Sequence, residues 1–287
     1  MSTHTQGAAE WVPTRDGREL YAMVLPGPDA HAPTVVFEAG SGANRSSWAL
    51  VQPAVAEFAR AVVYDRSGLG RSARDPSSRA LSRMAEDLSD LLDHFGSGPF
   101  ILVGWSAGGP IVRATAALQS DRITGVVLVD PTDEAAEILF SRRFRQTEKV
   151  ALRAGLQLAR AGLLGRIYAS VYRSIPLSDD VRHDLNTEGF TPGVLQTQIA
   201  QSRTYLDELQ VFRSNPPELG PIPVTVISGA RTGDGMNAVT RAAANASHAH
   251  RAAQSPAGRH VIAHDSGHYV PLTEPTVVIG EIRRVAA

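Results

Sequence analysis

Short apolar segments that alternate with longer helical ones constrain the fold of this chain more than any other feature. Six of them are predicted as strands: Thr34–Phe37, Ala61–Tyr64, Phe100–Val103, Gly125–Val129, Val224–Ser228 and Arg259–Ala263. Several are apolar at every position, which is typical of strands that helices cover on both faces. The helical patterns include Ser82–Phe95, Ser106–Gln119 and Thr276–Val285. This alternation predicts a mostly parallel sheet with right-handed crossovers.

Two more strands are expected near the start of the chain. The dipeptide Asp16-Gly17 is a tight-turn signal between two arms, Trp11–Pro13 and Glu19–Leu25. Such a turn between extended segments predicts a hairpin. With these arms, the expected sheet has eight strands.

The alternation stops between Pro131 and about Pro223, where no segment has a convincing strand pattern. One segment there has apolar residues at helical spacing, namely Leu152, Leu156, Ala159, Leu163 and Ile167. A basic amphipathic helix of this kind can lie on a membrane, but its glycines favour a lid helix that packs on the core. We therefore expect a core domain, residues 1–131 and 221–287, with a helical cap, residues 132–220, inserted after the sixth strand.

A G-x-S-x-G motif, Gly104-Trp105-Ser106-Ala107-Gly108, joins a predicted strand to a predicted helix. A sharp turn in this context holds the serine in a strained conformation and exposes its hydroxyl, while the glycines avoid collisions with neighbouring backbone. The start of the helix also favours developing negative charge. Ser106 is therefore the candidate nucleophile, and the alternative is a glycine-rich turn that only caps the helix.

Acyl transfer also needs two N–H donors for the oxyanion. We expect one from Ala107, directly after the nucleophile, and the other from Ser41 in the glycine-containing loop after the strand Thr34–Phe37. Gly42 is the alternative to Ser41. The nearby Glu38 would oppose an oxyanion, so we expect it to point away or to pair with a cation such as Arg45.

The general base should lie on a loop after a late strand. His268 follows the strand Arg259–Ala263 and a Ser-Gly turn, which predicts that it reaches Ser106; His264 at the strand end is the alternative. The histidines in this region do not match the spacing of common zinc sites. The chain has no cysteine, which excludes thiolate catalysis. We expect no metal and no cofactor.

Two carboxylates could orient the histidine. Asp130 directly ends the strand Gly125–Val129, and Asp234 follows the strand Val224–Ser228. The chain order Ser, Asp, His holds for either one. Asp65 is interpreted as part of a structural turn.

Together these segments resemble the α/β-hydrolase fold with a helical lid. The resemblance rests on Glu38-Ala39-Gly40-Ser41-Gly42, Tyr64-Asp65-Arg66-Ser67-Gly68-Leu69-Gly70-Arg71-Ser72, the motif around Ser106, and Ser266-Gly267-His268. In most members the acid stands three residues after a glycine that follows the next-to-last strand, but here that residue is Thr232. A minority takes the acid from the end of the preceding strand. The resemblance therefore favours Asp130, and Asp234 remains the alternative.

The resemblance implies a serine hydrolase that cleaves an ester or lactone bond of a small hydrophobic substrate through an acyl-enzyme. A cofactor-free haloperoxidase, a C–C hydrolase, or a ligand-binding receptor of the same fold with little turnover are alternatives. Haloalkane dehalogenases and epoxide hydrolases of this fold use an aspartate at the position of Ser106.

Charge and hydropathy complete the expectations. Lys+Arg is 28 and Asp+Glu is 29, so nothing suggests a nucleic-acid partner. No apolar run is long enough to span a membrane, and no signal peptide is evident. We expect a soluble, cytoplasmic protein, and a homodimer is left open.

Overall fold

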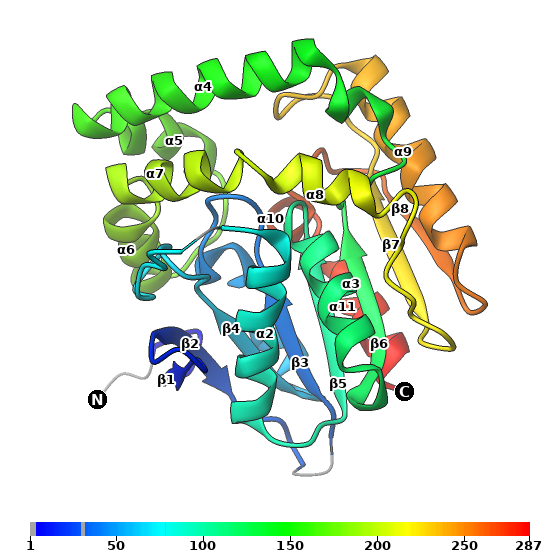
Figure 1. Cartoon of the computed structure of the whole chain (residues 1–287). Coiled ribbons are helices and arrows are strands. Elements are labelled where there is room, and N and C mark those ends of the chain that lie inside the picture. Colours follow the sequence, from blue (N-terminus) through cyan, green and yellow to red (C-terminus); the bar gives the residue numbers. More distant parts are fainter. Residues whose placement is uncertain (1–3, 30–31, 78) are drawn as a thin grey trace.

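The computed structural model describes residues 4–29, 32–77 and 79–287. They contain an eight-stranded sheet with the strand order β1-β2-β4-β3-β5-β6-β7-β8 (Figure 1). The strands are β1 Ala8–Pro13, β2 Glu19–Leu25, β3 Thr34–Glu38, β4 Arg60–Tyr64, β5 Phe100–Trp105, β6 Ile123–Val129, β7 Val224–Gly229 and β8 Arg259–Ala263. Strand β2 pairs antiparallel with β1 and β4, and the other neighbours pair in parallel. The predicted mostly parallel sheet is confirmed.

Helices cover both faces of this sheet. The helices that flank it are α1 Gln52–Val55, α2 Leu81–Phe95, α3 Gly108–Leu118, α9 Ala238–Ala253, α10 Val270–Thr273 and α11 Pro275–Ala286, with short 3-10 turns at Arg45–Trp48 and Ser120–Arg122. Successive side chains of one strand enter opposite cores. Leu102 packs with residues of α2 and α3, whereas Val103 packs with residues of α1 and α11. Both are fully buried, which explains why the strand is apolar at every position.

A long run of helices separates β6 from β7. It consists of a 3-10 turn at Glu137–Phe140 and α4 Arg142–Arg160, α5 Leu164–Tyr172, α6 Asp179–Glu188, α7 Pro192–Gln201 and α8 Tyr205–Val211. Figure 1 shows these helices at the end of the sheet where the parallel strands finish, with α4 outermost. None of residues 132–220, all of which are described, forms a strand. Its division from the core as a separate cap stays a proposal.

The expected single amphipathic helix over residues 152–167 is wrong in one respect. Helix α4 ends at Arg160, Gly162 has φ +67°, and α5 begins at Leu164. The stripe is therefore broken, and Leu163 and Ile167 are 41% and 52% exposed. A left-handed glycine after a helix is a common end signal, and here it outweighs the continued apolar spacing.

No helix among the described ranges combines the length and apolar character needed to cross a membrane.

The helical run is joined to the core through a buried guanidinium. Arg45 is fully buried, and its Nη1 lies 2.6 Å from Asp65 Oδ2 and 2.6 Å from Glu188 Oε2. The same side chain pairs with Asp184 of α6. One cation thus links the loop after β4 to α6, a segment more than 100 residues away in the chain.

Replacing Arg45 with methionine should lower the free energy of unfolding by about 3 kcal/mol or more, because buried carboxylates would lose their partner. Urea unfolding followed by circular dichroism measures this change. Arg143→Met, an exposed change on α4, should stay within about 0.5 kcal/mol of the parent. An equal effect of the two substitutions would contradict a linking role for Arg45.

Candidate active site

Ser106 lies in a strained turn between β5 and α3. Its φ is +53°, in the left-handed region that a residue with a Cβ rarely adopts. The surrounding backbone holds it there: Ser106 N donates to Val129 O at 3.0 Å, and Ser106 O accepts from Gly109 N at 3.0 Å and Thr132 N at 2.9 Å. The strain is thus maintained by the ends of two neighbouring strands, which leaves the hydroxyl at the sheet edge.

The glycines beside Ser106 permit close packing of the turn. A Cβ on Gly104 would lie 2.7 Å from Gly108 O, and a Cβ on Gly108 would lie 2.6 Å from Glu38 O. Both neighbours are backbone atoms that cannot rotate away. Glycine is therefore required at Gly104 because the turn folds back on itself there, and at Gly108 because the end of β3 passes beside it.

His268 meets the serine. Its Nε2 lies 2.9 Å from Ser106 Oγ. The loop that carries it is fixed at two points: Trp105 Nε1 donates to His268 O at 2.9 Å, and His268 N donates to Asp234 Oδ2 at 3.0 Å. His264, the alternative, is exposed, and the structure places the other ring at Ser106.

Asp130 meets the other side of the same ring. Its Oδ2 lies 2.6 Å from His268 Nδ1, while its Oδ1 accepts hydrogen bonds from Gly229 N at 3.0 Å and Arg241 Nη1 at 2.6 Å. Burial raises the pKa of Asp130, but the hydrogen bond and charge of His268, the charge of His248 and the hydrogen bond from Arg241 outweigh it and lower the pKa to about 2. The carboxylate is therefore ionised at neutral pH.

The two candidate acids thus have different contacts. Asp130 reaches the His268 ring, whereas Asp234 accepts from the His268 backbone and has φ +53°. Both residues come together with Ser106 in space, although about 100 residues separate them in the chain. Asp234 is placed to hold the histidine loop, and Asp130 is placed to orient the imidazole.

The two candidate oxyanion donors are oriented through their neighbouring carbonyls. Arg66 Nη2 donates to Gly40 O at 2.6 Å, and the Ser106 carbonyl is held by Gly109 and Thr132. In a trans peptide the C=O and the following N–H point in opposite directions. The N–H groups of Ser41 and Ala107 therefore point away from these buried partners, and neither donates a hydrogen bond to any described residue. Ser41 and Ala107 line one cavity together with Ser106, and Gly42 lines the neighbouring one.

Glu38 pairs with a cation and faces away from the cavity, as expected, but the cation is Arg66 and not Arg45. It is fully buried, pairs with Arg66 and accepts a hydrogen bond from the Tyr64 hydroxyl. Burial raises the pKa of Glu38 against the lowering effect of the Arg66 charge. The same Arg66 holds Gly40 O, so Glu38 supports the loop that carries Ser41 and faces away from the cavity.

Two cavities meet at Ser106 and His268. One, of about 380 Å³, has apolar walls that include Leu164, Tyr168 and Phe190. The other, of about 260 Å³, lies toward β7 and is lined by residues such as Phe144 and Leu206. The helices between β6 and β7 supply much of both walls. A substrate could therefore place a different group on each side of the serine.

Four contributors to the site were not predicted from sequence. Arg241 of α9 contacts Asp130, Trp105 holds the His268 loop, Tyr205 donates to Ala107 O at 2.7 Å, and Gln198 donates to Ser41 O at 3.1 Å. Trp105 stands inside the motif and was within reach of sequence reasoning. The other three lie on helices whose placement against the elbow no local pattern reveals.

Comparison with known proteins gives the family. The model of the alpha/beta hydrolase family matches residues 35–281, so the chain belongs to this family. An "AB hydrolase superfamily protein" of Gibberella zeae is 25% identical over 289 aligned positions, which cover 88% of this chain and 86% of that protein.

A second relative, from Caulobacter sp. (strain K31), has the name "Putative carbamate hydrolase RutD". It is 37% identical over 120 residues, which are 41% of this chain and less than half of that protein, 43%. Among solved structures, epoxide hydrolase CorEH superimposes with a TM-score of 0.75 over 97% of this chain and 98% of that chain. Its sequence identity is 17%, so this likeness shows the fold alone.

The packing of the elbow gives a testable prediction. Gly108→Ala should lower the free energy of unfolding by about 1–3 kcal/mol, because its Cβ would lie 2.6 Å from Glu38 O. Gly280→Ala is the matched control, since nothing lies within 4 Å of the added methyl group and alanine favours a helix by about 0.5–1 kcal/mol. Thermal or urea unfolding should give opposite signs for the two variants. Equal signs would mean that the elbow is not tightly packed.

Proposed function

We propose that this protein is a serine hydrolase that cleaves an ester or lactone bond of a small, largely apolar substrate through an acyl-enzyme. One observation carries the proposal: Asp130, His268 and Ser106 form a continuous chain of contacts of 2.6 Å and 2.9 Å. Residues 132–220 act as its cap, since they supply side chains to both cavities beside Ser106.

The proposed chemistry begins at the serine hydroxyl. Ser106 Oγ attacks the carbonyl carbon while its proton passes to His268 Nε2, and Asp130 stabilises the imidazolium. The N–H groups of Ala107 and Ser41, with Gly42 as the alternative to Ser41, stabilise the oxyanion. His268 then gives the proton to the leaving alcohol, which breaks the ester bond. A water molecule, deprotonated by His268, releases the acid and restores Ser106. These steps need no metal and no cofactor.

The nucleophile distinguishes the proposal from several relatives of the same fold. Epoxide hydrolases and haloalkane dehalogenases carry an aspartate where this chain has Ser106. A carbamate carbonyl, the group named for the RutD relative, is open to the same attack and belongs in a substrate panel. Cofactor-free haloperoxidase or C–C hydrolase chemistry, and a receptor with little turnover, remain the competing functions. Multiple turnover of an ester separates the proposed hydrolase from such a receptor.

A fluorophosphonate probe should modify Ser106, and peptide mapping should locate the adduct there. Ser106→Ala should abolish labelling and lower kcat for 4-nitrophenyl butyrate by at least about three orders of magnitude, because no other hydroxyl contacts His268 among the described residues. Ser41→Ala is the control, since its proposed donor is a backbone N–H. Full turnover by the Ser106→Ala protein would exclude the proposed mechanism.

The two candidate acids can be separated with the same chemical change at each. Asp130→Asn should lower kcat by about four orders of magnitude, because an amide cannot stabilise the imidazolium and favours the wrong tautomer. Asp234→Asn should lower it by less than about tenfold, since an amide oxygen can still accept from His268 N. Steady-state kinetics measures both. The reverse order of effects would assign the acid to Asp234.

A further inference from the structure

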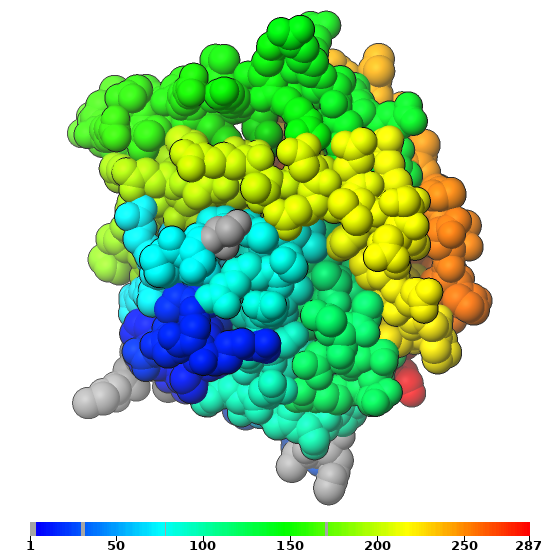
Figure 2. Space-filling view, viewed as in Figure 1, coloured from blue at the N-terminus to red at the C-terminus, as the bar shows by residue number. Residues whose placement is uncertain are grey.

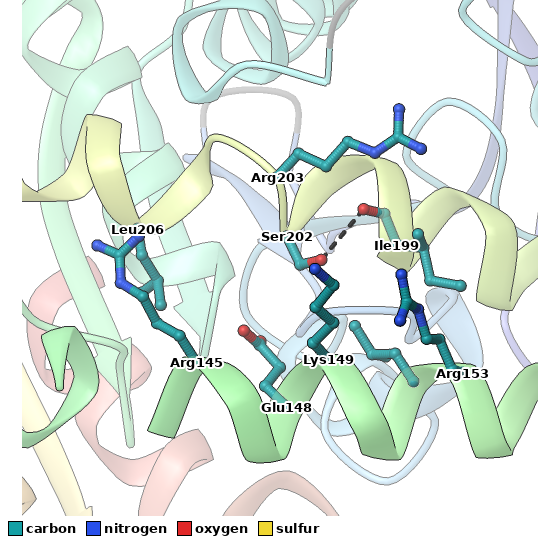
Figure 3. A pocket seen from close by; sticks show the side chains of 9 residues that line it. Arg145, Glu148, Lys149, Arg153, Ile199, Ser202, Arg203 and Leu206 are labelled. Carbon is teal, nitrogen blue, oxygen red and sulfur yellow. Dashed lines mark hydrogen bonds between the residues drawn. The ribbon is translucent and has the colours of Figure 1, made fainter. Parts of the chain in front are cut away.

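A third cavity adjoins the two at Ser106 and opens between α4 and α7. Its volume is about 440 Å³, and Figure 3 shows the side chains that line it. It shares Glu148 and Leu152 with the first cavity and Ser202 and Leu206 with the second. Figure 2 shows an opening between the green and yellow segments of the helical run on the outer surface. We call this third cavity the mouth, because it shares wall residues with both cavities at Ser106.

The mouth is lined by more positive than negative charge. Four of its nine lining residues are cationic, and Glu148 is the acidic one. Arg145 is paired with Asp207 at 2.6 Å, but Lys149, Arg153 and Arg203 are exposed. No carboxylate of the described residues lies within 4.0 Å of these three cations. Burial raises the pKa of Glu148, and the Arg145 charge lowers it to a smaller extent.

This surplus is local. Helix α4 has six basic residues and one acidic residue, whereas the whole chain has a net charge of -1. Core arginines such as Arg45 and Arg66 are paired with carboxylates. Lys149 is the only lysine of the chain. Lys149 and Arg153 stand one helical turn apart on α4, and Figure 3 shows both extending toward α7. Adjacent like charges repel, so this arrangement costs stability that a bound anion would recover.

The end of α7 offers a simpler explanation, since a helix C-terminus attracts cations. That effect is limited to about 0.3–1 kcal/mol for a single charge near the last turn. It favours Arg203, which follows α7 in the chain, but it does not explain why two further cations from another helix lie beside it. The common feature of the three is the opening that they share.

Resting on the proposed function, we infer that the mouth binds a carboxylate at the far end of the substrate. The preferred substrates are then half-esters of dicarboxylic acids: the reactive carbonyl lies at Ser106, the apolar chain in the cavity and the anionic end beside Lys149, Arg153 and Arg203. Unpaired cations at an entrance also raise the rate of encounter with anions.

Paired substrates test this inference. Mono-4-nitrophenyl esters of glutaric, adipic and suberic acid are compared with 4-nitrophenyl alkanoates of the same chain lengths. For the natural chain, kcat/KM should be higher for at least one half-ester than for its neutral partner, and this ratio should fall with added salt. In Lys149→Glu with Arg153→Glu the ratio should fall about tenfold or more.

The matched control changes the same charge on the same helix. Arg143→Glu with Arg160→Glu alters two exposed arginines of α4 that do not line the mouth, and it should leave the ratio within about twofold. If the parent and both double variants give equal ratios, the inference is overturned. Ester turnover by the parent would still support the proposed function. Circular dichroism of each variant checks that it is folded.

A binding measurement keeps the inference testable if no ester is turned over. Reductive methylation with ¹³C-formaldehyde gives one lysine signal, from Lys149, and leaves its charge intact. In the Ser106→Ala protein, monomethyl adipate should shift this signal and dimethyl adipate should not. A shift with both or with neither would overturn the inference, and failure of all ester turnover by the parent chain would separately overturn the proposed function.

Discussion

The buried carboxylate of Asp130 is the interaction on which the geometry of the site depends. It stands at the end of β6 with φ +41° and joins β7 through Gly229 N, α9 through Arg241, and the loop after β8 through His268. A buried charge is costly unless it is fully paired, so each partner must be in place for the fold to tolerate it. The contacts that stabilise the Asp130 carboxylate therefore also fix the His268 imidazole relative to Ser106.

Backbone groups are oriented in the same way at the other side of the serine. Arg66 holds the carbonyl before Ser41, and Tyr205 holds the carbonyl of Ala107. Both side chains are buried, and Arg66 is in turn neutralised by Glu38. The Arg66 bond lets the Ser41 N–H face the cavity without reorganising when a charge develops there, and the Tyr205 bond fixes the Ala107–Gly108 peptide next to the other proposed donor. The helical run between β6 and β7 contributes Tyr205, so it takes part in the site as well as covering it.

The sequence was most informative where a residue's role follows from its immediate neighbours. The apolar strands were predictable because both faces are buried, and the position of Ser106 was predictable because a strand, a turn and a helix follow one another. Partners set by distant contacts were not. Glu38 pairs with Arg66 and not with Arg45, and Arg241 pairs with Asp130. Neither partner could be predicted, because charges pair by proximity in the folded chain. The break at Gly162 shows that apolar spacing alone does not define a helix.

The distribution of arginine in this protein separates two uses of the same charge. In the core, Arg45, Arg66 and Arg241 are buried and each contacts a carboxylate, which their desolvation requires. At the mouth, Arg153 and Arg203 remain exposed and, with Lys149, lack such partners in the described chain. Exposed cations stay hydrated and lose little solvation free energy on folding, so folding does not require them to lie together there. Their common position beside a cavity that adjoins those at Ser106 fits the inferred anion site, and the apolar walls between them and the serine would define how far apart the anionic and reactive groups of the substrate must be.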